Sequence, residues 1–297
     1  MKLLKSTGFV SLLLAIVFIA PTASAATSPG LGAAGTFVIL SETYTNTASG
    51  TTINGNLGYT TAPAVNPTVN GNSHSVDSTY NQAGIDQGTA LSNLNSQPCT
   101  FNFPPGNIDL ASDETHGDVG VYSPGVYCIT GAASIGGGGM ITLDGPGTYI
   151  FRMDGALTTS ANSRVVLANG ASACNVWWTP TQATTLGANS TFAGIDIDAA
   201  GITIGDSVNW TGRALAFGGT VSTVRDTITA PNCSTSSPDE DGTPNGGTGS
   251  SVGPAVPGLP NTGIPSIVNV ILLSSLALTA VGVVATLYVV RKKAQSK

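Results

Sequence analysis

The sequence predicts a mainly β protein, in which short strands stack as the coils of a β-solenoid with one long helix alongside. Three observations predict this fold. Short alternating runs rich in Thr, Val, Ile and Gly, separated by frequent turns, are typical of strands. A repeat of about 18 residues in the second half of the chain is typical of a solenoid. One stretch, 76–95, instead places apolar side chains at helical spacing.

The composition restricts the classes of function. Of the 297 residues, 41% are hydrophobic and 9% are charged, and the formal net charge is −6. Nucleic-acid binding depends on clustered Lys and Arg, so no nucleic-acid partner is expected. Every Lys lies near one of the two ends, which excludes lysine Schiff-base and P-loop chemistry from the part between them. We expect neither catalysis nor a cofactor.

Residues 1–25 have the organisation of a secretory signal peptide. Lys2 and Lys5 precede an apolar run over 10–20, and the small-residue sequence ASA at 23–25 provides a cleavage site. The run is too short for an ordinary membrane-spanning helix. The protein is therefore expected to be secreted.

The C-terminus, 259–297, combines a short motif, an apolar run and a basic tail. The motif is LPNTG (Leu259, Pro260, Asn261, Thr262 and Gly263). The run over 268–290 is long enough to span a bilayer, and the basic residues after it should stay cytoplasmic. This order resembles the LPxTG sorting signal of Gram-positive surface proteins. The resemblance implies that a sortase cuts after Thr262 and joins the chain to peptidoglycan. The alternative is a simple type I membrane protein.

Between these ends lie one domain, 26–233, and a linker, 234–258. The linker is rich in Ser, Gly and Pro and lacks large apolar residues, so it is expected to be an extended spacer. The domain contains all four cysteines, and an even count in an exported domain predicts two disulfides. Of the three possible connectivities we favour Cys99–Cys128 with Cys174–Cys233. A zinc site is the alternative, but no CxxC is present, and neither His74 nor His116 is near a cysteine in sequence.

The helix is predicted over 76–95, despite Gly84 and Gly88. Ser75 is the expected N-cap, and Asp77 falls in the first turn. The apolar face should lie on the sheet. It comprises Val76, Tyr80, Ala83, Ala90, Leu91 and Leu94.

The repeat aligns TTLGANSTFAG at 184–194 with ITIGDSVNWTG at 202–212. VSTVRDTIT at 221–229 continues the pattern, and ALTTSANSRVV at 156–166 precedes it more loosely. Alternation along each strand then predicts two inward ladders: Leu186, Ile204 and Val224, and Phe192, Trp210 and Ile228. It predicts two outward faces: Thr185, Thr203 and Ser222 on one, and Thr191, Asn209, Thr211, Thr227 and Thr229 on the other.

These outward positions carry hydroxyl, amide and methyl groups with very little charge. Stacked coils lie about 4.7–4.9 Å apart, so the groups repeat on a nearly regular grid. Such a grid orders water at its surface, which is the physical requirement for adsorbing to the water lattice of ice. Four residues interrupt it in the sequence: Gly187, Gly205, Asp206 and Asp226.

Six segments together resemble the microbial ice-binding domain family. They are GLGAAGTFVIL at 30–40, INGNLG at 53–58, PGVY at 124–127, YIFRM at 149–153, ACNVWW at 173–178 and NWTGRA at 209–214. The resemblance implies a discontinuous, right-handed β-solenoid of triangular section with one long helix packed alongside. It also implies binding to ice and inhibition of ice growth or recrystallisation. We expect a monomer displayed on the cell wall of a Gram-positive-type bacterium.

Three alternatives remain. In an enzyme, Asp196 and Asp198 share a face and Arg213 falls one coil later, an arrangement suited to acid–base chemistry. In a calcium site, oxygens from Asp109, Asp113, Glu114 and Asp118 would surround the ion near His116, although the spacing matches no EF-hand loop.

In an adhesin of the same fold, Trp177, Trp178 and Trp210 would stack on sugars. Alternation is expected to bury Trp210 and only one of the adjacent pair. An aromatic patch would favour the adhesin, and a flat Thr/Ser/Asn face would favour ice.

Overall fold

The fold is taken from a computed structural model that describes residues 25–233. The predicted signal peptide, the linker, the LPNTG motif and the apolar run 268–290 lie outside the described residues. No helix among the described residues is long and apolar enough to cross a membrane. The described residues, 25–233, belong to one compact unit that contains both disulfides. This unit therefore has its own core and suits experiments on its own.

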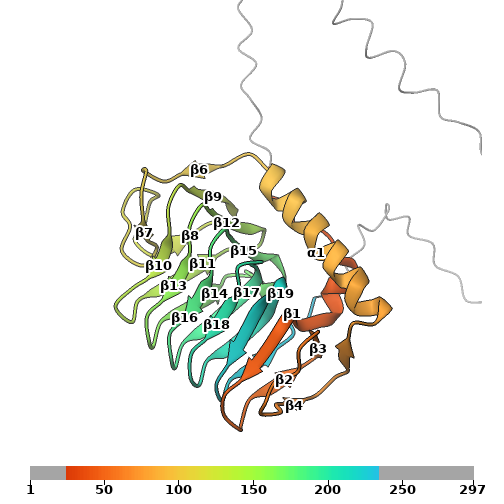
Figure 1. Cartoon of the computed structure of the whole chain (residues 1–297). Coiled ribbons are helices and arrows are strands. Elements are labelled where there is room, and N and C mark those ends of the chain that lie inside the picture. The colour runs from red at the N-terminus through yellow and green to blue at the C-terminus, as the bar shows by residue number, and fades with distance from the viewer. Residues whose placement is uncertain (1–24, 234–297) are drawn as a thin grey trace, which may run out of the picture. The chain divides into compact units, whose positions relative to one another are not determined.

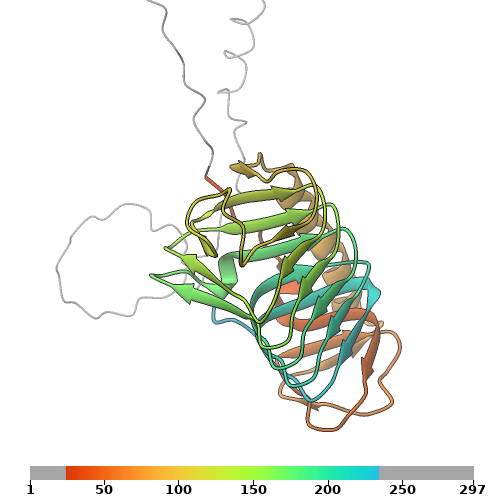
Figure 2. The ribbon, with the colours of Figure 1, turned by 90° about the vertical axis from the view of Figure 1, so that its left-hand side faces the viewer.

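All strand pairings are parallel, and they form three columns that we name faces A, B and C (Figures 1 and 2). Face A consists of β6 (Phe101–Asn102), β9 (Gly125–Ile129), β12 (Tyr149–Met153), β15 (Val176–Pro180), the end of β17 (Thr191–Ile197), the middle of β19 (Asn209–Thr223), the start of β1 (Phe37–Asn46), β3 (Asn56–Tyr59) and β5 (Ser73–Ser75). Face B consists of β7 (Ile108–Asp109), β10 (Ala133–Ile135), β13 (Leu157–Thr159), β16 (Thr184–Leu186), β18 (Ile202–Ile204) and the ends of β19 and β1. Face C consists of β8 (Val121–Tyr122), β11 (Met140–Asp144), β14 (Arg164–Ala168), the starts of β17 and β19, β20 (Thr227–Thr229), β2 (Thr52–Asn54) and β4 (Thr68–Val69).

The coils are not stacked in the order of the sequence. The chain first builds the coils of β1 to β5 at one end of the stack. The helix α1 (Ser78–Ser96) then runs along the stack to β6 at the other end, and later coils return toward the start (Figure 1). As a result β1 pairs with β3 on one side and with β19 on the other. The mainly β fold with parallel coils and one helix is confirmed, whereas the right-handed winding stays a prediction.

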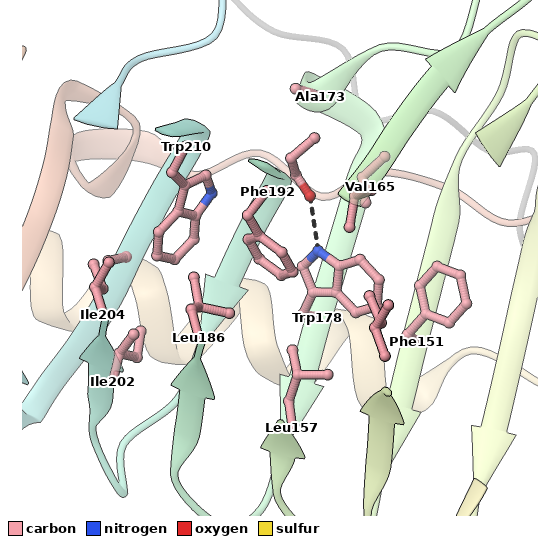
Figure 3. Packing of buried hydrophobic residues seen from close by; sticks show 14 of the residues in the cluster. Phe151, Leu157, Val165, Ala173, Trp178, Leu186, Phe192, Ile202, Ile204 and Trp210 are labelled. Carbon is pink, nitrogen blue, oxygen red and sulfur yellow. Dashed lines mark hydrogen bonds between the residues drawn. The ribbon is translucent and has the colours of Figure 1, made fainter. Parts of the chain in front are cut away.

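The inside of the coils is filled by stacked apolar side chains (Figure 3). Phe192 pairs with Trp210, and Trp210 with Ile228, so this predicted inward ladder is confirmed. The rings of Phe151 and Trp178 stack with centroids 4.4 Å apart. The indole N–H of Trp178 donates to the Ala193 carbonyl at 2.9 Å, which satisfies the polar end of a buried ring.

The other predicted ladder is wrong at one position. Leu186 pairs with Ile204 and both are buried, but Val224 is half-exposed and follows the end of β19. Thr203 pairs with the outward Ser222, so the next inward position falls to Thr223, which is fully buried. Residues two apart in a strand share a side, and Val224 therefore cannot point inward beside Ser222.

The helix begins later than predicted. Asp77 is the N-cap, where its Oδ1 accepts from the Tyr80 N–H at 2.8 Å, whereas Ser75 ends strand β5. Val76 has φ +54° and is 56% exposed, so its assignment to the apolar stripe is wrong. The buried positions of α1 are Tyr80, Ala83, Gln87, Ala90 and Leu94.

The apolar residues among these form a second apolar cluster with the outward side of face A, including Leu40, Ile150 and Trp177. The middle strands of face A are therefore covered on both sides, whereas β5 and β6 at its ends remain partly exposed. The short 3₁₀ helices η1 (Gly32–Thr36) and η2 (Ala173–Asn175) lie at its border. Trp177 and Trp178 are consequently both buried, and the expectation that only one would be is wrong. The indole N–H of Trp177 donates to Ser28 Oγ at 3.0 Å.

Two helix glycines have opposite surroundings and form a matched test of this packing. A Cβ on Gly84 would overlap the ring of Phe217, whereas a Cβ on Gly88 would meet nothing within 4 Å. We expect Gly84→Ala to lower the free energy of unfolding by roughly 1–3 kcal/mol through overpacking. Gly88→Ala should raise it by roughly 0.5–1 kcal/mol through helix propensity. Urea denaturation measures both, and equal effects of the two substitutions would contradict the packing of α1 on face A.

Both favoured disulfides are present, with Cα–Cα distances of 5.8 Å for Cys99–Cys128 and 5.6 Å for Cys174–Cys233. No described cysteine is free, so none is left for the zinc alternative. The first disulfide holds the segment after α1 against β9. Arg152 contacts both of its sulfurs at 2.9 Å and donates to the carbonyls of Asn95 and Gln97, at the end of α1.

Candidate functional site

Face B carries a straight row of outward hydroxyl groups, which we name the hydroxyl row. Strand register aligns its members directly above one another over six coils. Thr185, Thr203 and Ser222 lie together in this row, as the repeat predicts. In order along the stack the row is Ser134, Thr158, Thr185, Thr203, Ser222 and Thr45.

The repeat did not identify Ser134, Thr158 or Thr45 as members of the row. The interval from Thr158 to Thr185 exceeds the 18 residues between Thr185 and Thr203, because the connecting turns differ in length. Thr45 enters from the first strand of the chain, far away in sequence. Only the alternating pattern of single short strands, such as LTT at 157–159, carried a signal for these members.

The central hydroxyls of the row face solvent. Thr158, Thr185 and Thr203 are exposed, and their Oγ1 atoms form no hydrogen bond to other residues of 25–233. Thr45 Oγ1 donates to Ser222 Oγ at 2.7 Å, at one end of the row. The inward neighbours on both sides of each central Thr are buried, as the pair Ile202 and Ile204 shows. The backbone that presents these hydroxyls is thus fixed by the core.

Face C brings together the second set of predicted residues. Thr191, Asn209 and Thr227 are aligned by register, as are Thr211 and Thr229. The alignment continues through Thr52 to Thr68 and through Asn54 beside Asn70. Several of these groups bond to each other: Asn54 Nδ2 donates to Thr229 Oγ1 at 2.9 Å, and Asn70 Nδ2 donates to Asn54 Oδ1 at 2.7 Å.

Face C is also less uniform than face B. Ala193 stands beside Thr211, and Arg164 pairs with Thr191 in the next coil. Beyond Arg164 the surface is mixed, with Val121 and Met140 exposed and Thr142 and Asp144 half-exposed. The regular alignment of Thr and Asn on face C therefore ends at Arg164.

The four expected interruptions lie at the border of the faces or below the surface. Asp206 pairs with Arg225 at the turn between faces B and C. Asp226 is fully buried and accepts from the N–H groups of Val208 at 2.8 Å and Val224 at 2.6 Å. Burial raises the pKa of Asp226 to about 7, although both N–H groups favour its charged form.

Gly187 and Gly205 border the hydroxyl row. A Cβ on Gly205 would lie 2.6 Å from the Leu186 carbonyl oxygen in the neighbouring coil. Gly187 likewise has no room, because its Cβ would overlap the backbone of Ser160. These glycines permit the close approach of successive turns and leave the row free of large flanking side chains.

The acid–base alternative does not form a site. Asp196 and Asp198 are both buried, and Asp198 accepts from the N–H groups of Thr184 at 2.7 Å and Ala200 at 2.8 Å. Burial, with a further contribution from the Asp198 charge, raises the pKa of Asp196 well above its usual value. Arg213 pairs in register with Ile195 and donates to the Phe37 carbonyl, so it points away from both carboxyls.

The acidic loop before Val119 is held by local hydrogen bonds. Asp113 Oδ1 contacts His116 Nδ1 at 3.0 Å, and Asp109 Oδ1 accepts from the N–H groups of Ala111 and Gly136. Among residues 25–233 no three His, Cys, Asp or Glu side chains are grouped so that they could hold a metal ion. The three tryptophans also offer no exposed ring on which a sugar could stack, as the adhesin alternative requires, because each of them is at most 1% exposed.

Comparison with known proteins identifies the family. The model of the Ice-binding-like family matches residues 38–229. An ice-binding protein of Nostoc sp. (strain HG1) is 34% identical over 212 residues, which cover 67% of this chain and 73% of that protein.

Solved structures agree. The crystal structure of an ice-binding protein from an Antarctic biological consortium superposes with a TM-score of 0.62 at 28% identity, covering 70% of this chain and 93% of that one. An ice-binding protein of the Antarctic ascomycete Antarctomyces psychrotrophicus gives a TM-score of 0.60 at 28% identity, covering 70% and 100%. Since the family match spans more than half of its length, the chain belongs to the Ice-binding-like family.

Proposed function

We propose that this protein adsorbs to ice through the hydroxyl row of face B and thereby inhibits ice growth or recrystallisation. The observation that carries the proposal is the alignment of six Ser and Thr side chains over six successive coils. The names of the relatives agree with this function.

The row has the chemistry that adsorption to a water lattice needs. Neighbouring parallel strands hold their side chains about 4.8 Å apart, so the hydroxyls repeat at a nearly constant interval. Each Thr adds a methyl group, which limits random hydrogen bonding of the nearby water. The central hydroxyls of Thr158, Thr185 and Thr203 are exposed and available to anchor ordered water molecules.

Face B suits this role better than face C for two reasons. A charged residue borders each set, Asp109 beside Ser134 and Arg164 beside Thr191, but every position of the hydroxyl row carries a hydroxyl, whereas Ala193 interrupts face C. Part of the hydrogen-bonding capacity of face C is already used in the contacts of Asn54 with Thr229 and Asn70.

The direct test uses oxidised residues 26–236 in assays of ice recrystallisation inhibition and thermal hysteresis. Bovine albumin at equal concentration is the control for non-specific effects. We expect clear recrystallisation inhibition at about micromolar concentration. A folded sample, verified by circular dichroism, that behaves like albumin would overturn the proposal.

We also propose that the protein acts at the cell surface, anchored to peptidoglycan by a sortase. The sequence supports this through the signal-like segment 1–25 and the LPNTG motif ahead of an apolar run. Thr262→Ala in the full chain should move the protein from the cell-wall fraction to the membrane or the medium. An unchanged distribution would contradict the anchoring proposal and leave the ice-binding proposal unaffected.

A further inference from the structure

A cleft of about 390 Å³ lies between α1 and the strand ends of face A, where β12, β15 and β17 lead toward face B. Its apolar wall includes Leu91, Pro180 and Ile197. Its polar wall comes from three neighbouring strand ends and the last turn of α1, and includes Asn95, Arg152, Asp154, Thr179, Thr181 and Asp198. Neither the proposed ice surface nor the family match assigns a role to this cleft.

Two polar groups of the cleft lack protein partners. The Thr179 side chain is 2% exposed, and its buried Oγ finds no hydrogen-bond partner within residues 25–233. A buried hydroxyl without a partner costs roughly 1–3 kcal/mol, so it marks a place where a ligand hydroxyl is favourable. Asp154 is exposed at the rim, and its carboxylate forms no ion pair in the described part of the chain.

The remaining charges restrict the ligand. Arg152 uses both Nη atoms on Asn95 O, Gln97 O and the two sulfurs of the disulfide, so its fork is not free to bind a carboxylate or phosphate. The same guanidinium disfavours a cation. An anion is disfavoured by Asp154, and by Asp198 where that group is ionised.

A neutral ligand with several hydroxyls suits both the unpartnered polar groups of the cleft and the restriction on charge. Its hydroxyls would donate to Asp154 and pair with Thr179, Thr181 and Asn95, while its C–H face would lie against Leu91 and Ala199. Ligand pockets commonly measure about 300–1,000 Å³, so this volume suits a single sugar ring. We propose that the cleft is a binding site for one neutral sugar residue, such as the end of a surface glycan.

The proposal is independent of ice binding, because the cleft belongs to face A and the hydroxyl row to face B. Without an aromatic ring in its wall the cleft offers limited stacking, and the dissociation constant should lie in about the millimolar range. A glycan site on one face and an ice surface on another would let one domain contact both.

The test is a titration of ¹⁵N-labelled residues 26–236, followed by amide chemical shifts. The probes are methyl glucoside, methyl galactoside, methyl mannoside and N-acetylglucosamine, with sodium phosphate and guanidinium chloride as the charged comparisons. We expect saturable shifts for at least one sugar at the amides of Asn95, Asp154, Thr179 and Ala200. The charged comparisons should produce no saturable shift there.

Three variants separate binding from structure. Asp154→Asn should weaken sugar binding by about fivefold or more, and Thr179→Val should weaken it without destabilising the fold. Asp118→Asn removes an exposed carboxylate that does not line the cleft and serves as the matched control, with unchanged affinity. Absence of saturable shifts for all four sugars, binding of a charged probe instead, or equal affinity in Asp154→Asn would overturn the proposal. Thr203→Tyr should leave sugar binding intact, so failure of the ice proposal is distinguishable from failure of this one.

Discussion

Thr203→Tyr is expected to reduce ice recrystallisation inhibition by about tenfold or more, a factor that corresponds to ~1.4 kcal/mol. Thr203 lies in the hydroxyl row between Thr185 and Ser222, and its side chain is exposed to solvent. A phenol ring at this position would project beyond its neighbours and hold the rest of the row away from a flat crystal surface. The loss should therefore exceed the contribution of one threonine.

Stability should not change with this substitution, because the Thr203 side chain is exposed and makes none of the core contacts of Ile202 or Ile204. Urea denaturation of the variant and the wild type at the same pH measures this. Unchanged stability with lost ice activity would assign the effect to the surface itself.

The matched control is Thr211→Tyr, which places the same ring on face C beside Ala193 and Thr229. If face B is the ice surface, Thr211→Tyr should retain most of the activity. Loss in Thr211→Tyr with full activity in Thr203→Tyr would move the ice surface to face C. Full activity in both variants would refute adsorption through either face.

The sequence predicted those parts of the fold in which the repeat length stays constant. Phe192, Trp210 and Ile228 are spaced by 18 residues each, and strand pairing in the structure keeps that spacing. In the last coil the segment that runs from face C to face B differs in length from the same segment of the preceding coil. The prediction that Val224 points inward is wrong for this reason. The earlier members of the hydroxyl row were missed for the same reason.

The alternation of inward and outward residues along a strand could not predict which outward side chains are buried by distant segments of the chain. Trp177 points outward from its strand, yet Ser28 and the apolar side of α1 bury it. The cleft depends on the same docking, since Leu91 and Asn95 come from the helix and the other walls from face A. Such sites arise from packing between segments that a local pattern does not relate.

The buried carboxyls predict an unusual dependence of stability on pH. Burial is the main cause that raises the pKa of Asp226 to about 7, from an ordinary aspartate value near 3.8. Because the pKa of Asp226 is higher in the folded than in the unfolded state, its contribution to stability is complete at a pH below the pKa of the unfolded state. That contribution is lost as pH rises through about 7. One pKa unit corresponds to ~1.4 kcal/mol, so the loss should be roughly 2–4 kcal/mol after allowance for solvent screening.

Asp196 acts in the same direction. Its carboxyl is fully buried, finds no hydrogen-bond partner within 25–233 and lies near Asp198, whose own pKa is raised by burial. On the acid side, Asp77 and Asp113 have lowered pKa values, so their small contributions are lost as pH falls. We therefore expect maximal stability on the acidic side of neutrality and a decline from pH 5 to pH 8.

Two substitutions identify the groups responsible. Asp196→Asn keeps the shape and cannot ionise, so it should stabilise the protein at pH 8 relative to wild type and flatten the decline. Asp226→Asn should also flatten it, but at pH 5 it should cost roughly 1–3 kcal/mol, because one of the N–H groups of Val208 and Val224 loses its acceptor. Urea denaturation at pH 5, 6, 7 and 8 measures these effects, with Asp118→Asn as the exposed control. A wild-type stability that is constant or rises over this range would show that the buried carboxyls do not retain their protons in the folded state.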